Sequence, residues 1–225
     1  MTTTTLTRSD HEIQRAVEAQ LSWTPIVDEA GIGVSVEDGA VTLSGDVDTL
    51  QERIAATKAA LSVRGVSVVA DELRVHPHTS ARIATTDSDI AAALHRAFEW
   101  STDVPPTVKA EVKNHIVTLT GEVQWNYQRD AARRVAEHTR GVYGVGNMIT
   151  LFKRPSATDV AERIRNAMAR TAALDAKAVT VTSAGTTVTL TGTVRSFAER
   201  RQAGLAAWSS PHVTDVHNNL IVKSD

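Results

Sequence analysis

A short motif that occurs three times constrains the fold of this 225-residue chain more than any other feature. The motif reads Val-Thr-Leu-Ser/Thr-Gly, with a valine two residues after the glycine and an arginine eight residues after it. Its copies begin at Val41, Val117 and Val188. Self-similarity at a nearly constant period is the signature of tandem structural units. The chain is therefore predicted to contain three copies of one small unit rather than one large domain.

The glycine of each motif copy is predicted to have a structural role. These residues are Gly45, Gly121 and Gly192, and they stand 76 and 71 positions apart. The chain leaves a strand for a helix at this point, and glycine tolerates the positive φ or the close packing that such a junction requires. We therefore interpret the three glycines as the structural motif of the repeat rather than as ligand-binding residues.

Each copy shows the same order of predicted elements. Apolar residues spaced by four, such as Ile13, Val17 and Leu21, predict an amphipathic first helix. Alternating apolar residues, turn residues and then the motif itself predict a hairpin. A second helix and a final strand follow, with the strand ending at Val75, Leu151 or Val222. The predicted fold class is α+β, with three tandem α-β-β-α-β units, each a three-stranded sheet covered by two amphipathic helices.

Polar segments that contain proline separate the copies. The predicted units are residues 8–76, 87–152 and 157–223, with a tail at 1–7 and linkers at 77–86 and 153–156.

Composition excludes several classes of function. The chain has no cysteine, which rules out disulfides, cysteine-ligated metals and a thiol nucleophile. No export signal and no apolar run of membrane-spanning length is visible, so the expected location is cytoplasmic. The net charge is −2, distributed as −6, +1 and +2 over residues 8–76, 87–154 and 155–225, with the remaining +1 from Arg82 in the first linker. A nucleic-acid partner is not expected, because nucleic-acid binders carry a basic surplus.

No motif for catalysis or for a cofactor is found. The chain has no nucleophile elbow, no phosphate-binding Gly-Lys-Ser/Thr and no His-Glu-x-x-His. His76 and His78 lie close together, but two histidines without a third ligand are interpreted as solvated linker residues rather than as a metal site. We predict a protein that is not an enzyme, with no cofactor and no metal.

One segment is predicted as a candidate ligand-binding site. Two aromatic residues stand beside three arginines, at Trp125, Tyr127, Arg129, Arg133 and Arg134. Aromatic side chains beside arginines suit a lipid headgroup boundary or a partner protein. The alternative is that the aromatic residues pack inside the protein while the arginines pair with acidic residues of their own helix.

Trp23 and Trp100 occupy equivalent positions of the first helix in two copies, and we expect both to pack in the core.

The repeated pattern resembles the BON domain family. The second copy carries the fullest match, with Val-x-Leu-Thr-Gly-x-Val from Val117, then Gly141-Val142, then Asn147-Met148-Ile149. Three such units cover nearly the whole chain. The resemblance implies an α/β sandwich without a catalytic constellation, an association with osmotic and envelope stress in bacteria, and contact with phospholipid.

Three functional hypotheses follow from these observations. The first is a stress-associated adaptor that binds phospholipid or a membrane surface. The second is a protein-interaction scaffold or self-associating adaptor, because the repeats carry opposite charge. The third is a sensor of monovalent cations, by analogy with a potassium-binding relative of the family. No sequence feature indicates the oligomeric state.

Overall fold

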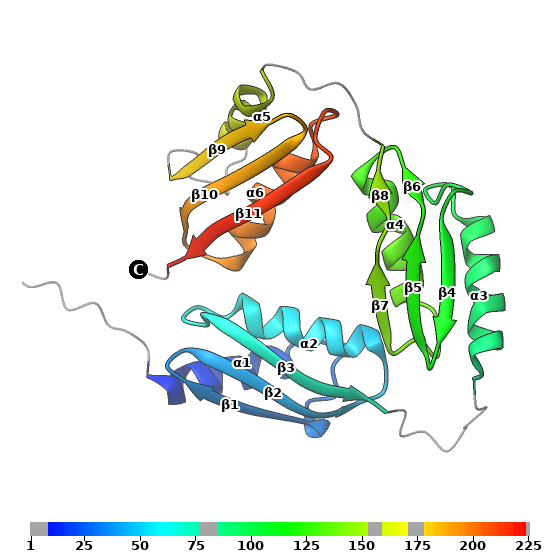
Figure 1. Ribbon diagram of the computed structural model, residues 1–225. Coiled ribbons are helices and arrows are strands. Elements are labelled where there is room, and N and C mark those ends of the chain that lie inside the picture. Colours follow the sequence, from blue (N-terminus) through cyan, green and yellow to red (C-terminus); the bar gives the residue numbers. More distant parts are fainter. Residues whose placement is uncertain (1–8, 77–84, 153–158, 171–177, 224–225) are drawn as a thin grey trace, which may run out of the picture. The chain divides into compact units, whose positions relative to one another are not determined.

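The three predicted units are each present as a small α+β fold (Figure 1). The computed structural model describes residues 9–76, 85–152, 159–170 and 178–223. The predicted tail at 1–7, residues 77–84 of the first linker and the second linker at 153–156 lie outside the described residues. Each unit combines a three-stranded mixed sheet with two α-helices, which confirms the predicted fold class.

The first unit contains α1 (Asp10–Ser22), a short 3-10 helix (Glu29–Gly31), β1 (Ile32–Glu37), β2 (Ala40–Val47), α2 (Leu50–Ser62) and β3 (Val68–Val75). Strand β2 is central, antiparallel to β1 and parallel to β3. The antiparallel pair is a hairpin with a two-residue loop, whereas the parallel pair is joined through α2, as a parallel connection requires.

The second unit repeats this topology with interrupted strands. Its elements are α3 (Asp87–Trp100), β4 (Lys109–Lys113), β5 (Ile116–Thr120), β6 (Glu122–Val123), α4 (Asn126–Glu137), β7 (Gly144–Asn147) and β8 (Thr150–Leu151). Strand β5 lies between β4 and β7, and β6 pairs in parallel with β8. The short pairs β5–β7 and β6–β8 therefore take the place of the single long parallel pair of the first unit.

The third unit contains α5 (Val160–Ala169), β9 (Val179–Ala184), β10 (Thr187–Val194), α6 (Phe197–Trp208) and β11 (Asp215–Val222). Strand β10 is central, antiparallel to β9 and parallel to β11 over eight residue pairs.

Helix starts are fixed by side chains that satisfy the free backbone N–H groups. Ser9 and Glu12 form a reciprocal capping box at α1, and Thr86 and Asp89 form another at α3. The second helix of each unit is held by the acidic or amide residue that precedes the repeated arginine. In each case its side-chain oxygen accepts a hydrogen bond from the backbone N–H four residues earlier: Glu52 from Asp48, Gln128 from Gln124 and Glu199 from Arg195.

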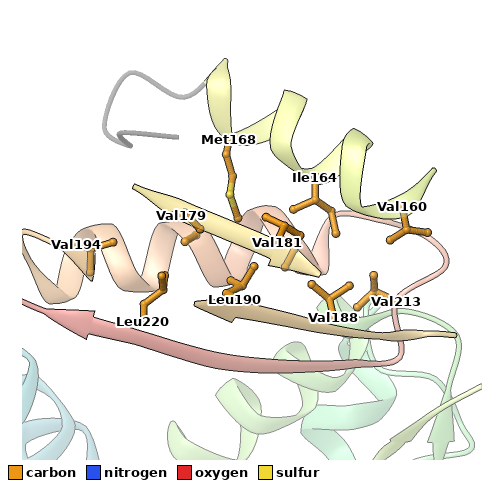
Figure 2. Close-up of a cluster of buried hydrophobic side chains, with 12 residues drawn as sticks. Val160, Ile164, Met168, Val179, Val181, Val188, Leu190, Val194, Val213 and Leu220 are labelled. Carbon is orange, nitrogen blue, oxygen red and sulfur yellow. The ribbon is translucent and has the colours of Figure 1, made fainter. Parts of the chain in front are cut away.

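The core of each unit lies between one face of the sheet and the two helices. Figure 2 shows this layer in the third unit, where Ile164 and Met168 point from α5 toward the strands. Val188 and Leu190 of β10 are fully buried, and small alanines on α6 let the helix backbone approach the sheet. The equivalent leucines Leu43 and Leu119 are also fully buried. Aliphatic residues thus supply nearly all of the core volume.

The repeated glycine lies where the central strand meets the backbone that leads into the first strand. Its φ is +122° in Gly45, +123° in Gly121 and +121° in Gly192. A Cβ at these positions would stand 2.1 to 2.3 Å from the carbonyl oxygen of Gly31, Thr107 or Ala178 respectively. Both the backbone conformation and the space therefore require glycine.

Candidate functional site

The predicted ligand-binding segment forms the start and the middle of α4. Trp125 is the N-cap residue and is half-buried, whereas the Tyr127 side chain is exposed. Arg129 is half-buried, and its backbone carbonyl accepts a hydrogen bond from Asn147 Nδ2 at 3.2 Å. The segment therefore combines half-buried side chains with an exposed tyrosine.

Ion pairs within the helix occupy one of the arginines. Arg133 donates to Glu137 at 2.8 Å and lies 3.9 Å from Asp130. The neighbouring Arg134 is exposed. The alternative in which the helix's own carboxylates take the arginines is thus realised at Arg133, and the charge that α4 presents to solvent comes mainly from Arg134.

Trp23 and Trp100 are not in the core, so the prediction that they pack there was wrong. Trp23 is 84% exposed and Trp100 is 87% exposed, the two largest exposed fractions among the large apolar side chains described. Each stands at the C-terminal end of the first helix of its unit. Two indoles are therefore displayed to solvent at matching places in two units.

Helix geometry explains why these tryptophans point outward. The apolar stripe of α1 is Ile13, Val17 and Leu21, and at 100° per residue Trp23 lies about 120° from the centre of that stripe. The same spacing relates Ile90 to Trp100. A helical projection of the sequence contains this signal, whereas the prediction relied on the equivalent positions of the two tryptophans in the repeat.

A carboxylate at the start of the first helix holds the hairpin turn in two units. Asp10 accepts from the backbone N–H groups of Asp38 and Gly39, at 2.9 and 3.0 Å. Asp87 accepts from those of Asn114 and His115, at 2.8 and 2.9 Å. Asn114 and His115 both have positive φ, which the bonds from Asp87 help to stabilise. The bond from the His115 N–H is the largest cause that lowers the pKa of Asp87, followed by the bond from Asn114.

Replacing Asp87 with Asn is expected to weaken the acid dependence of stability. Because the pKa of Asp87 is lowered on folding from its ordinary 3.8, its contribution is complete above that value and is lost as the pH falls through the folded pKa. Urea unfolding between pH 7 and pH 3 should show the gap between wild type and Asp87→Asn closing at the acid end. Asp103→Asn changes an exposed carboxylate outside the hairpin turn, so it is the control and should run parallel to wild type. If the curve for Asp87→Asn also runs parallel to wild type, the Asp87 carboxylate does not stabilise the hairpin turn.

The repeated arginine and the last strand are tied together in every unit. In the second and third units the amide Nδ2 of Asn147 or Asn218 donates to the carbonyl of Arg129 or Arg200, at 3.2 and 2.9 Å. In the first unit the same position is Asp71, which has no donor. Its carboxylate instead accepts from Arg53 Nε, at 3.1 and 3.0 Å, and from the Thr57 hydroxyl at 3.1 Å. This repeated pair is a structural tie between helix and sheet.

Asn218→Ala is expected to destabilise the third unit by about 1–2 kcal/mol, because it removes the bond to Arg200 and the one accepted from the Leu220 N–H. Chemical unfolding followed by the amide signals of the third unit measures the effect. Asn219→Ala alters the adjacent, exposed residue of β11 and should change stability by less than about 0.5 kcal/mol. Equal losses in the two variants would refute the tie.

Within the described residues, no group of three or more histidine, aspartate or glutamate side chains is placed to hold a metal ion. His76 is exposed, and His78 lies outside the described residues. None of the helices in the described ranges has both the length and the apolar character needed to cross a membrane.

The tandem units and their repeated glycine define a BON-domain architecture. The family model for the BON domain matches residues 9–77, 86–151 and 156–224. The chain therefore belongs to the BON domain family, with three copies of the domain.

Two curated relatives are similar to this chain. Osmotically-inducible protein Y of Escherichia coli (strain K12) is 30% identical over 141 residues, which is 61% of this chain and 70% of that protein. A 21 kDa hemolysin of Actinobacillus pleuropneumoniae is 31% identical over 123 residues, which is 54% of this chain and 63% of that protein.

Solved structures of CdsD, a structural protein of the type III secretion system of Chlamydia trachomatis, also align with the chain. The alignment with the C-terminal domain has 11% identity and a TM-score of 0.27, and covers 96% of this chain and all of that one. A second CdsD structure aligns with a TM-score of 0.26 and 11% identity, over 94% of this chain and 92% of that one.

Proposed function

We propose that this chain is a non-enzymatic BON protein that contacts a phospholipid surface through the exposed indoles of Trp23 and Trp100. The observation that carries the proposal is their exposure, 84% and 87%, at equivalent helix ends. Indole has a large apolar surface and one polar N–H, and tryptophan is enriched where membrane meets water for that reason. Burying the indoles in the headgroup region would remove apolar surface from water without moving any core residue.

The net charge of the unit around each tryptophan indicates which of the two binds an anionic surface more strongly. Residues 8–76, which carry Trp23, have a net charge of −6, whereas residues 87–154, which carry Trp100, have a net charge of +1. Anionic lipid repels the first and tolerates the second. Trp100 is therefore the proposed principal contact on anionic membranes. The predicted segment from Trp125 to Arg134 stays in the proposal as a secondary contact, through the exposed Tyr127 and Arg134.

The similarity to an osmotically inducible protein supports a role in the response to osmotic stress. The expected cytoplasmic location is a separate part of the proposal, which fractionation of cells that express the chain would test.

Vesicle cosedimentation of the full chain tests the lipid contact. One set of vesicles contains phosphatidylglycerol and phosphatidylcholine, the other phosphatidylcholine alone, at low salt and at about 0.15 M salt. Binding is expected to the anionic vesicles and to weaken with salt. No recovery with either set would reject the lipid proposal and favour the protein-interaction scaffold, whereas equal recovery with both would reject the ranking by charge.

A further inference from the structure

The third unit has a small cavity of about 270 Å³ between α5 and the turn that follows α6. Arg163 and Arg170 line it from the helix side, and Ser209, Ser210 and Pro211 line it from the turn. All of these residues belong to one unit. The cavity thus joins two cationic side chains to two hydroxyl groups.

The arginines keep donors free for a ligand. Arg163 uses its Nε for Asp159, at 2.6 Å, which leaves its two terminal nitrogens for another acceptor. Arg170 is exposed, and its side chain forms no ion pair or hydrogen bond with another described residue. The two residues are seven positions apart on the helix and therefore lie on nearly the same side.

Ser210 contributes a buried hydroxyl group to the lining of the cavity. The residue is only 9% exposed, and its hydroxyl oxygen is buried without a hydrogen-bond partner among the described residues. A buried polar group without a hydrogen-bond partner is uncommon because it destabilises the fold. The Ser210 hydroxyl is therefore a candidate for a hydrogen bond to a ligand. The same position is the apolar Val63 in the first unit. In the second unit it is Thr139, whose hydroxyl donates to the Val135 carbonyl at 2.9 Å.

Comparison of the three units shows that the cationic lining belongs to the third unit alone. Counted from the first apolar residue of the helix, the position of Arg163 is Ala16 in the first unit and Ala93 in the second. The position of Arg170 is Trp23 and Trp100 in those units. The third unit thus differs from the others at the helix positions that line the cavity on one side and at the turn position that faces them.

We propose that this cavity binds the phosphate group of a phosphate ester, held by Arg163, Arg170 and Ser210. Phosphate presents several acceptor oxygens in a tetrahedral arrangement, which suits two guanidinium forks and a hydroxyl that approach from different elements. The Ser210 hydroxyl is almost fully buried, so a rotation about the Cα–Cβ bond would be needed to turn it toward the ligand. Asp159 lowers the affinity for the anion, because its negative charge repels the anion and its carboxylate pairs with Arg163. The ester is either a soluble metabolite or a lipid headgroup, and only the second source rests on the proposed function.

Titration of the full chain with inorganic phosphate, followed by the amide NMR signals around Ser209 and Ser210, tests the pocket. The double variant Arg163→Ala/Arg170→Ser removes both guanidinium groups at exposed positions, so it should fold, and it adds no indole that could itself contact vesicles. It is expected to weaken phosphate binding by at least about tenfold. Arg165→Ala changes an arginine of the same helix that does not line the cavity, and should alter binding by less than about twofold. Asp159→Asn releases Arg163 and should tighten binding.

The same variants on phosphatidylglycerol vesicles separate the two sources. Loss of both phosphate and vesicle binding in the double variant identifies a lipid headgroup as the ligand. Loss of phosphate binding with vesicle binding retained identifies a soluble ester, supports the pocket, and leaves the contact at Trp100 standing. Phosphate affinity that is unchanged in the double variant, or phosphate shifts confined to other units, overturns the pocket whatever the vesicles show.

Discussion

Gly192→Ala is expected to unfold the third unit while the other two units stay folded. The residue has a φ of +121°, where alanine is strained by about 1–3 kcal/mol. Its Cβ would also stand 2.1 Å from the carbonyl oxygen of Ala178, and that atom is backbone. Relief of the clash would move β9 away from β10, so the total cost should exceed about 3 kcal/mol, a large part of the stability of a small domain.

Gly185→Ala is the matched control in the same unit. Gly185 also has a positive φ, of +61°, but a Cβ there would meet nothing within 4 Å. Its cost should be about 1 kcal/mol, from backbone strain alone. Urea unfolding followed by amide NMR signals of each unit gives both values. Equal losses of stability in the two variants would show that the close approach to Ala178 does not contribute to the effect of Gly192→Ala.

Trp100→Ser is expected to lower the affinity for anionic vesicles by about tenfold, since one indole supplies much of the apolar area available to the bilayer. Trp23→Ser should have a smaller effect on the same vesicles, because its unit is strongly acidic. Neither change should alter stability by more than about 0.5 kcal/mol, since both side chains are almost fully exposed. Cosedimentation measures the affinity and thermal unfolding the stability.

Tyr127→Ser with Arg134→Ala serves as the comparison on the other candidate surface. If vesicle affinity falls in this variant and not in Trp100→Ser, the contact lies on α4 and the proposal about the indoles is wrong. Trp208→Ser is a positive control for the stability assay, because Trp208 packs against the core of the third unit and its loss should destabilise that unit.

Much of the fold was predictable because the same pattern of apolar and turn residues occurs in all three units. Apolar spacing at Ile13, Val17 and Leu21 predicted a helix that exists, and all three residues are buried. The strand ends at Val75, Leu151 and Val222 also agree with the structure. Local periodicity determines such elements, and each unit is too small to override it with distant contacts.

The surface was harder to predict because it depends on which way a side chain leaves its helix. Trp23 and Trp100 were predicted to lie in the core because they occupy equivalent positions of the first helix, although their angular position on the helix places them outside it. Likewise, the residues from Trp125 to Arg134 are neighbours in the sequence, but α4 places their side chains on different sides of the helix. Arg133 also forms an ion pair with Glu137. The Ser210 hydroxyl without a hydrogen-bond partner could not be predicted from the sequence, because the absence of a partner depends on the neighbouring residues of α5.

The exposed end of the first helix also bears on how the three units diverged from one another. With the glycine and the arginine tie maintaining each fold, a residue that is more than four-fifths exposed has little influence on whether its unit folds. The position therefore tolerates different side chains, and the third unit holds Arg170 there. Neither packing nor folding requires tryptophan at this position in the other two units, which agrees with the proposed contact with another surface.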